Sequence, residues 1–245
     1  MSRNANDSTQ DGQRSGLERY HFVLRRLHSL TGIIPVGAFL VLHILTNFNF
    51  VFEGPEGYNR EVRFIHKIPY LPLVEWVFIF LPLAYHAGYG MFITFTGKSN
   101  VQHYRYGGNL RYTMQRVTGI LVLLFVIVHL AKFRFAYLLP DSWNIPDFNP
   151  GDAAYITSAG LDQLWVVIFY IVGVAATAFH FSNGIWTFLI VWGITLGPQS
   201  QRKSGYVCAF IGVGLGIAGI ISVLWFHLFP AESTQAAELI RQLCC

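Results

Sequence analysis

Four histidines lie within four separate apolar stretches of this 245-residue chain: His43, His86, His129 and His180. An imidazole can bind a metal ion or carry a proton near neutral pH. An ionisable side chain inside a membrane-spanning segment indicates a functional site, because its burial in lipid is costly. The chain has only three cysteines and no CxxC pair, which excludes an iron–sulfur cluster or a structural zinc held by cysteines.

Long helices must position these histidines. The chain is 53% hydrophobic and 12% charged, about half the charged fraction of a soluble domain. Five apolar runs reach the ~20 residues that a helix needs to cross a hydrocarbon core of ~30 Å; they cover residues 31–52, 71–95, 117–139, 164–196 and 205–229. The sequence therefore predicts an all-α integral membrane protein with five transmembrane helices. We expect a disordered N-terminal tail, the membrane domain and a C-terminal tail at residues 1–20, 21–230 and 231–245.

The basic residues predict the orientation, because cytoplasmic connections carry an excess of Lys and Arg. The N-terminal tail and the connections on its side hold 11 of them: Arg3, Arg14, Arg19, Arg25, Arg26, Lys98, Arg105, Arg111, Arg116, Arg202 and Lys203. The other side holds six: Arg60, Arg63, Lys67, Lys132, Arg134 and Arg241. We expect a multi-pass protein of the inner (cytoplasmic) membrane with the N-terminus in the cytoplasm and the C-terminus outside. The net charge of +4 is too small to indicate a nucleic-acid partner.

The positions of the histidines along their helices place them at two levels. His43 and His129 each lie twelve residues past the inner start of an apolar run, which is ~18 Å at the helical rise per residue. His86 and His180 lie fifteen and sixteen residues below the outer start, which is ~23 Å. In a core of ~30 Å, His43 and His129 therefore share the outer half, and His86 and His180 share the inner half.

Two histidine pairs favour haem over zinc or copper. Two trans imidazoles fill the axial positions of a tetrapyrrole that supplies the other four ligands, whereas zinc requires four protein ligands at one point. Gly90 and Gly184 follow His86 and His180 by one turn and leave room for a flat macrocycle. No CxxCH motif is present, so two non-covalent b haems are predicted. Six-coordinate iron limits the chemistry to electron transfer.

A proton or ion pathway is the competing interpretation, because buried histidines also mark transporters. Such a pathway would need further acidic side chains within the spans and interrupted helices. Only Glu75 comes close, one turn inside the outer end of its helix, where we expect a solvated or aromatic-belt position. The long outer stretch at 140–162 is expected to form a folded loop or cap.

Haem propionates need polar partners where they leave the apolar core. For the outer haem, Lys132 follows His129 by three residues on one helix face, although it can also extend to the membrane surface. For the inner haem the candidates are His28, Ser29 and Arg116, and His28 can equally cap its helix. Among the remaining histidines, one is expected to be interfacial, His227, and three to be solvated: His21, His66 and His103.

Four motifs in order resemble the cytochrome b subunit of type B succinate:quinone oxidoreductases, the cytochrome b558 of succinate dehydrogenase. They are RRLHSLTGIIPVG at 25–37, FLPLAYH at 80–86, QRVTGI at 115–120 and FHFSNGIW at 179–186. The match extends into WGIT at 192–195 and PQSQR at 198–202 and covers roughly residues 20–228.

The resemblance implies five transmembrane helices and two b haems, with His86 and His180 on the inner haem and His43 and His129 on the outer one. It implies that the chain anchors a cytoplasmic flavoprotein and an iron–sulfur protein. Electrons from succinate would pass through these to the inner haem, the outer haem and a quinone, typically menaquinone. The chain would carry no catalytic residue for the dicarboxylate, since it has no dinucleotide-binding glycine motif. The basic inner face would dock the iron–sulfur subunit.

The resemblance also implies a quinone site near the outer haem, bordered by the connections at 53–70 and 140–162, with Glu61 and His66 as candidate proton donors or acceptors. Some fumarate-reducing members carry a glutamate two residues before the fourth histidine, where this chain has Ala178. That departure favours succinate oxidation. The cytochrome b of a fumarate reductase or of another membrane dehydrogenase, and a histidine-lined transporter, remain the alternatives.

Overall fold

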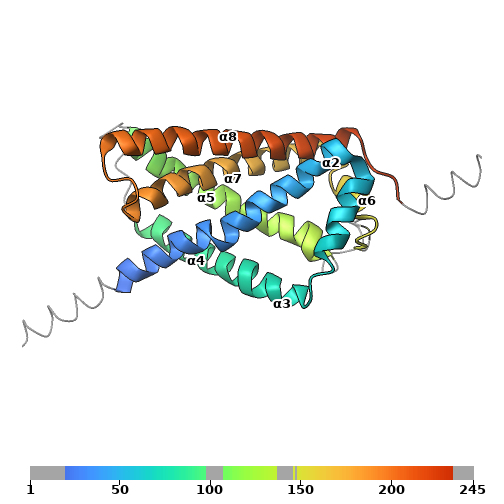
Figure 1. Cartoon of the computed structure of the whole chain (residues 1–245), viewed down its shortest axis with the longest axis horizontal. Coiled ribbons are helices and arrows are strands. Elements are labelled where there is room, and N and C mark those ends of the chain that lie inside the picture. Colours follow the sequence, from blue (N-terminus) through green and yellow to red (C-terminus); the bar gives the residue numbers. More distant parts are fainter. Residues whose placement is uncertain (1–19, 98–106, 137–145, 147, 234–245) are drawn as a thin grey trace, which may run out of the picture.

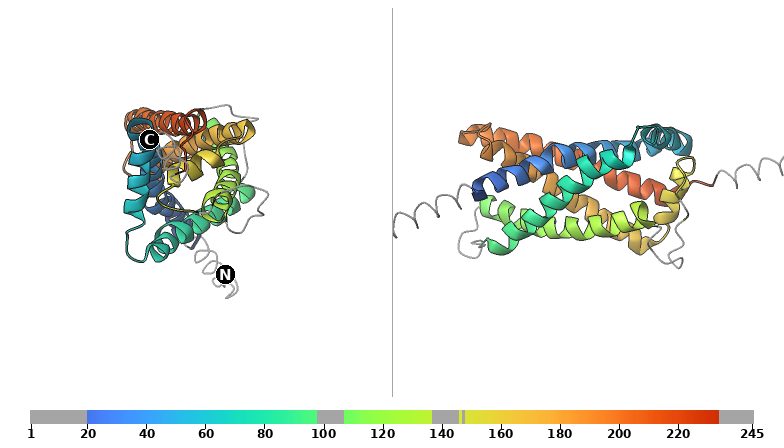
Figure 2. Two further views of the ribbon diagram at one scale, coloured as in Figure 1. Left: turned by 90° about the vertical axis from the view of Figure 1, so that its right-hand side faces the viewer. Right: turned by 90° about the horizontal axis from the view of Figure 1, so that it is seen from below.

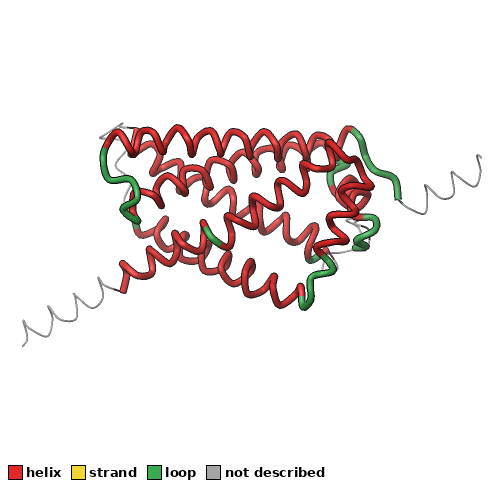
Figure 3. The backbone as a smooth tube through the Cα atoms, viewed as in Figure 1, coloured by secondary structure: helices red, strands yellow, loops and turns green. Residues whose placement is uncertain are grey.

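The computed structural model describes residues 20–97, 107–136, 146 and 148–233, and all regular secondary structure in them is helical (Figure 1, Figure 3). Within these residues, five helices are long and apolar enough to cross a membrane: Tyr20–Ile65, Leu71–Thr96, Gly107–Phe133, Leu164–Val191 and Pro198–Leu228. The predicted all-α membrane fold with five spans is thereby confirmed. The two predicted tails lie almost entirely outside the described residues.

The helices form an elongated bundle with two different ends (Figure 1). At one end, α4 (Leu81–Thr96) and α7 (Leu164–Val191) finish and α8 (Pro198–Leu228) begins. We call it the arginine-rich end, for Arg25, Arg26, Arg111, Arg116 and Arg202. The opposite end is covered by the short helix α6 (Ala153–Gly160) and the last part of α2 (Pro35–Ile65), and we call it the capped end (Figure 2).

The helices extend beyond the apolar runs that predicted them. The first span is already helical at residue 20, the first described residue, rather than only from 31, and it continues to residue 65 through most of the connection expected at 53–70. Likewise, α8 begins at Pro198 rather than at 205. Polar residues add helical turns outside the hydrocarbon core, so the apolar pattern marks only the middle of each helix.

The helix α2 changes direction at Gly54. This residue has φ 66° and ψ −165°, a backbone conformation that glycine adopts far more readily than other residues. Pro55 follows and cannot donate an amide proton to a continuing helix. Residues 55–65 therefore form a separate helical segment that lies across the capped end (Figure 2).

The second span contains a wider turn that accommodates a proline. It consists of α3 (Leu71–Glu75), the π-helical turn η1 (Trp76–Phe80) and α4. Pro82 lacks an amide proton, and its ring would clash with the preceding turn of a regular α-helix. A second π-turn, η2 (Leu130–Arg134), directly follows His129 at the end of α5 (Gly107–His129). Such turns often adjoin functional sites, and each of these lies in a span that carries one of the four histidines.

Small residues bring α7 and α8 close together. A Cβ built on Gly212 would lie 2.6 Å from the Cβ of Ser182, and one on Gly219 would lie 2.8 Å from Cγ1 of Val174. Between them, a Cβ on Gly216 would lie 3.3 Å from the Cβ of Ala178. Close packing of small residues is a main source of helix association in lipid, because no hydrophobic force acts between helices there.

A compact aromatic core holds the capped end together. Phe50 and Phe226 stack at 4.1 Å between ring centroids, and Tyr58 packs edge-on against Phe226 at 5.2 Å. The Asn59 side-chain oxygen accepts a hydrogen bond of 2.8 Å from the Ala154 amide and fixes α6 to α2. Within the described residues of the stretch at 140–162, for which a folded loop or cap is predicted, α6 forms part of this capped end.

Many apolar side chains on the helices are exposed. Phe95 is 75% exposed, Phe210 80% and Leu228 61%. A soluble protein rarely exposes contiguous apolar surface of this extent, so lipid must cover it.

Candidate functional site

His86 on α4 and His180 on α7 face each other in the half of the bundle nearer the arginine-rich end. Their ring centroids are 6.1 Å apart and the ring planes cross at 89°. The two residues come from helices far apart in sequence, so packing of the bundle brings them together. Both side chains are half-buried.

His43 on α2 and His129 at the end of α5 form a second pair nearer the capped end. Their ring centroids are 5.6 Å apart and the planes cross at 76°. Phe39 stacks on His43 at 5.4 Å, and Phe125 stacks on His129 at 5.7 Å. The structure thus brings together the two pairs that helix depth predicted, while haem ligation remains a prediction.

The spacing within each pair fits two axial ligands of one haem iron. A metal–imidazole bond is about 2 Å long, so two trans nitrogens lie about 4 Å apart and their ring centroids about 6 Å apart. The observed centroid separations are 5.6 and 6.1 Å. Within the described residues, no group of three or more His, Cys, Asp or Glu side chains could hold a metal ion. A pair alone suits a group that brings its remaining ligands with it.

Hydrogen bonds at Nδ1 orient three of the four imidazoles. Nδ1 of His86 lies 3.0 Å from the His28 carbonyl oxygen, and Nδ1 of His180 lies 3.1 Å from the Gln115 carbonyl oxygen. Nδ1 of His129 lies 3.3 Å from the Tyr170 hydroxyl. A metal-binding histidine characteristically uses its second ring nitrogen in this way, which leaves Nε2 for the metal.

Two of these partners, Gln115 and Tyr170, are not predictable from the sequence pattern. Gln115 lies in the QRVTGI motif, but no role followed from that motif. Its side-chain nitrogen donates a 3.1 Å hydrogen bond to the His180 carbonyl oxygen, and its side-chain oxygen accepts a 2.8 Å hydrogen bond from the Asn183 amide. Tyr170 is one of several hydroxyl-bearing residues within a long apolar run. Only the angle at which α7 passes α5 reveals that this hydroxyl reaches His129.

Two glycines leave space for the imidazoles nearer the arginine-rich end. A Cβ on Gly32 would lie 2.6 Å from Nδ1 of His86, and one on Gly119 would lie 3.1 Å from Cε1 of His180. Both glycines fall within the motifs at 25–37 and 115–120. A side chain at either position would therefore displace a histidine ring.

Of the candidate propionate contacts on that side, His28 lies beside His86. The His28 ring stacks on His86 with centroids 4.2 Å apart, and its Nδ1 is buried without a hydrogen-bond partner. The Tyr89 hydroxyl is also buried and unpartnered, and its ring lies 5.9 Å from that of His28. The Ser29 hydroxyl already accepts a 3.0 Å hydrogen bond from the Trp192 indole. An additional polar group at this place would satisfy His28 and Tyr89.

Arg116 and Lys132 are held away from open solvent. Arg116 donates to the carbonyl oxygens of Gly97 at 2.9 Å and Ile93 at 3.1 Å and thus caps the end of α4, while its Nε is buried without a partner. Lys132 is 8% exposed and lies beneath α6, where a Cβ on Gly160 would be 3.5 Å from its Cε.

The other histidines have local contacts. Nδ1 of His227 lies 2.8 Å from the Leu161 carbonyl oxygen, so this residue has a backbone partner, and His21 stacks loosely on Phe92 at 6.1 Å. His66 is exposed and its ring lies 4.9 Å from Phe148. His103 lies outside the described residues.

Glu75, for which a solvated or aromatic-belt position is predicted, forms an ion pair. Its carboxylate forms a 2.7 Å ion pair with the Arg134 guanidinium, and its side chain is only 18% exposed. The pair joins the second and third spans near the capped end and neutralises the acid that a proton pathway would need.

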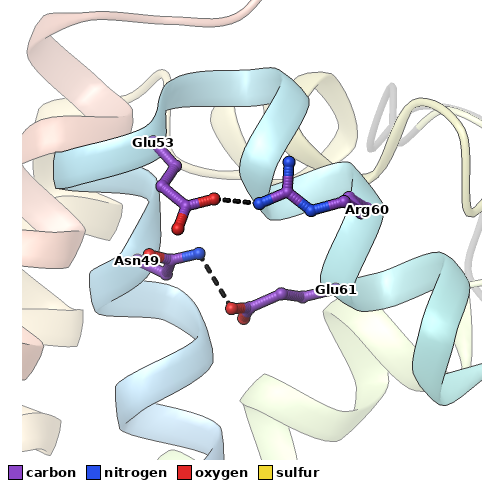
Figure 4. Close-up of polar contacts among 4 residues, drawn as sticks. All are labelled: Asn49, Glu53, Arg60 and Glu61. Atoms are coloured by element: carbon purple, nitrogen blue, oxygen red, sulfur yellow. Dashed lines mark hydrogen bonds and ion pairs between the residues drawn. The ribbon is translucent and has the colours of Figure 1, made fainter.

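A cavity of about 320 Å³ opens on α2 between its membrane part and the segment across the capped end. Four apolar residues line it, Leu42, Leu45, Phe48 and Phe52, together with three polar ones, Thr46, Asn49 and Glu61. The Asn49 amide donates a 2.8 Å hydrogen bond to Glu61, and Arg60 pairs with Glu53 beside it (Figure 4). The bend at Gly54 is what brings Glu61 back over the face that carries Leu42 and Asn49.

Comparison with known proteins identifies the family. No family model matches the chain. The succinate dehydrogenase cytochrome b558 subunit of Bacillus subtilis (strain 168) is 42% identical over 212 residues, which span 86% of this chain and 99% of that protein. The match therefore spans nearly the whole of that protein and most of this chain. The chain therefore belongs to the family of succinate dehydrogenase cytochrome b558 subunits.

Proposed function

We propose that this chain is the dihaem cytochrome b subunit that anchors succinate dehydrogenase to the membrane and delivers its electrons to a quinone. The observation that carries the proposal is the pair of crossed imidazole couples, with centroids 6.1 and 5.6 Å apart, one toward each end of the bundle. Family membership supports the choice of succinate dehydrogenase over other membrane dehydrogenases.

His86 and His180 would hold one haem b, and His43 and His129 the other. When bound, the haems supply one-electron chemistry that links the iron–sulfur partner to the quinone. The Nδ1 hydrogen bonds of His86, His180 and His129 fix the rings and would leave Nε2 of each to bind the iron. The surrounding apolar helices keep water away from both couples.

The propionate contacts follow from the unpartnered polar atoms. Toward the arginine-rich end, His28 offers a free Nδ1, Tyr89 a free hydroxyl and Arg116 a free Nε. Ser29 would have to turn its hydroxyl proton from the Arg26 carbonyl to a propionate, while it keeps the hydrogen bond from Trp192. Toward the capped end, Lys132 supplies the buried cation next to the His129 couple.

The cavity on α2 is our proposed quinone site. It lies on the same helix as His43 and combines an apolar wall with Asn49 and Glu61, as a hydrophobic ring with two carbonyl oxygens requires. Glu61 would exchange protons with the bound quinone, and menaquinone is the quinone typical of the family. His66 does not line the cavity, so Glu61 is the stronger candidate.

The arginine-rich end would face the cytoplasm, because basic residues remain on that side of the membrane. It would therefore meet the iron–sulfur and flavoprotein subunits. In the described residues, the two ion pairs involve Arg60 and Arg134 on the opposite side, so no carboxylate neutralises the exposed Arg25 at this end.

Single histidine substitutions in the assembled complex test the proposal. His86→Ala and His180→Ala should each leave one haem per chain by pyridine haemochrome assay, with the same remaining absorption spectrum. His43→Ala and His129→Ala should leave the other spectrum. All four should stop succinate-driven quinone reduction.

His227→Ala is the matched control, because His227 lies in a span but binds a backbone carbonyl. It should keep both haems. Two haems in a variant of any of the four paired histidines, or different spectra within one couple, would show that the pairing is wrong.

A further inference from the structure

A second cavity of about 320 Å³ lies at the arginine-rich end, between α5, α7 and α8. It is lined by Gly107, Gly108, Arg111, Trp186, Pro198, Gln201, Arg202, Gly205 and Tyr206. None of these residues contacts a histidine couple or the cavity on α2. The cavity therefore calls for its own explanation.

Its inner wall is a preformed cation on an aromatic platform. The Arg111 guanidinium lies over the Trp186 ring at 4.5 Å from the centroid, and the Trp186 indole donates a 2.8 Å hydrogen bond to the Gln201 carbonyl. Gly205 makes this arrangement possible, because a Cβ there would lie 3.3 Å from the indole nitrogen and 3.6 Å from Nη1 of Arg111. Arg202 is exposed on the opposite rim.

The helices that surround this cavity carry no acidic residue that could neutralise the charges of Arg111 and Arg202. The chain has no Asp or Glu at 76–140 or at 163–231, the stretches that contain α4, α5, α7 and α8. Two arginines around one cavity without a carboxylate attract an anion, and the planar guanidinium suits a phosphate in particular.

A continuous apolar track leads from the cavity toward the middle of the membrane. Tyr206, Phe210, Val213 and Ile217 follow at helical spacing on one face of α8 and are 72%, 80%, 61% and 54% exposed. A soluble protein partner could not contact this track, because the track extends toward the membrane interior. A molecule with an anionic head and an acyl chain fits both parts at once.

We propose that this groove binds an anionic phospholipid, with its phosphate between Arg111 and Arg202 and an acyl chain along Tyr206, Phe210 and Val213. Basic pockets between transmembrane helices on the cytoplasmic side bind anionic headgroups by this chemistry. The site is separate from the haem and quinone sites, so the proposal stands independently of them.

Native mass spectrometry of the full chain in neutral detergent tests the proposal, with titration of dioleoyl phosphatidylglycerol. Arg111→Gln and Arg202→Gln should each weaken binding about tenfold, because each removes a charge-assisted hydrogen bond. Lys203→Gln is the matched control, since it removes the same charge from the next residue, outside the cavity, and should change affinity less than twofold. Far-UV circular dichroism checks folding, and Arg202→Gln, at an exposed position, keeps the test valid should Arg111→Gln not fold.

Two further arms separate the sources of the phosphate and the kinds of partner. Phosphatidylcholine and inorganic phosphate should bind at least tenfold more weakly than phosphatidylglycerol; equal binding of either would overturn the proposal. Unchanged lipid affinity in both arginine variants, together with loss of the iron–sulfur subunit from the complex, would identify the groove as a protein interface and also refute it.

Discussion

Replacing Gly32 by alanine tests whether His86 is held where the structure places it. A Cβ at position 32 would lie 2.6 Å from Nδ1 of His86, well inside van der Waals contact. The imidazole must therefore move, and its 3.0 Å hydrogen bond with the His28 carbonyl is lost. Both changes act on the proposed haem ligand without altering the ligand itself.

The expected magnitude follows from three contributions. Overpacking costs about 1–3 kcal/mol, and the lost hydrogen bond about 1 kcal/mol more. The higher helix propensity of alanine offsets about 1 kcal/mol. We therefore expect a net destabilisation of about 1–3 kcal/mol. Loss of the contact that orients a metal ligand lowers affinity for the bound group about 10–100-fold.

Gly214→Ala is the matched control, because a Cβ at this helical glycine meets nothing within 4 Å. It gains the same propensity without the clash. Gly32→Ala should purify with about one haem per chain by pyridine haemochrome assay and melt at a lower temperature, whereas Gly214→Ala should keep both haems. Two haems and an unchanged melting temperature in Gly32→Ala would refute the contact between Gly32 and His86.

Three further predictions concern other parts of the molecule. Tyr170→Phe removes the hydroxyl 3.3 Å from Nδ1 of His129 and should weaken retention of that haem about tenfold, measured by haem titration of the apoprotein; equal affinity would mean that the hydroxyl does not orient the ring. Glu61→Gln preserves an oxygen for the Asn49 amide but cannot exchange protons, so quinone reduction should fall at least about tenfold with haem content unchanged; full activity would move the quinone site elsewhere. Gly212→Leu should lower stability by about 1–3 kcal/mol in thermal melts because its side chain meets Ser182, while Gly214→Leu should not; equal melts would contradict the packing of α7 on α8.

The sequence predicted the spans and the histidine pairs well because both depend on one-dimensional patterns. A run of about 20 apolar residues crosses a membrane whatever its neighbours are, and helical rise converts residue number into depth. Histidines at equal depth, His43 with His129 and His86 with His180, can therefore be paired before the packing of the helices is known.

The residues around the histidines could not be found in this way. Tyr170 contacts His129, and Gln115 contacts His180. Both contacts depend on the angles at which the helices cross, and depth alone does not give those angles. The role of Glu75 was missed for the same reason, because its partner Arg134 comes from another span.

What the chain determines by itself is thus the number of helices, the level of each imidazole and the side on which positive charge gathers, since hydrophobicity and charge act residue by residue against the membrane. Only the tertiary structure decides which histidine ring nitrogens form hydrogen bonds. It also decides that the bend at Gly54 brings Glu61 over Asn49, and that Arg111 lies over Trp186. These features depend on contacts of a few ångströms between segments distant in sequence, and such contacts exist only once small residues have let the helices pack.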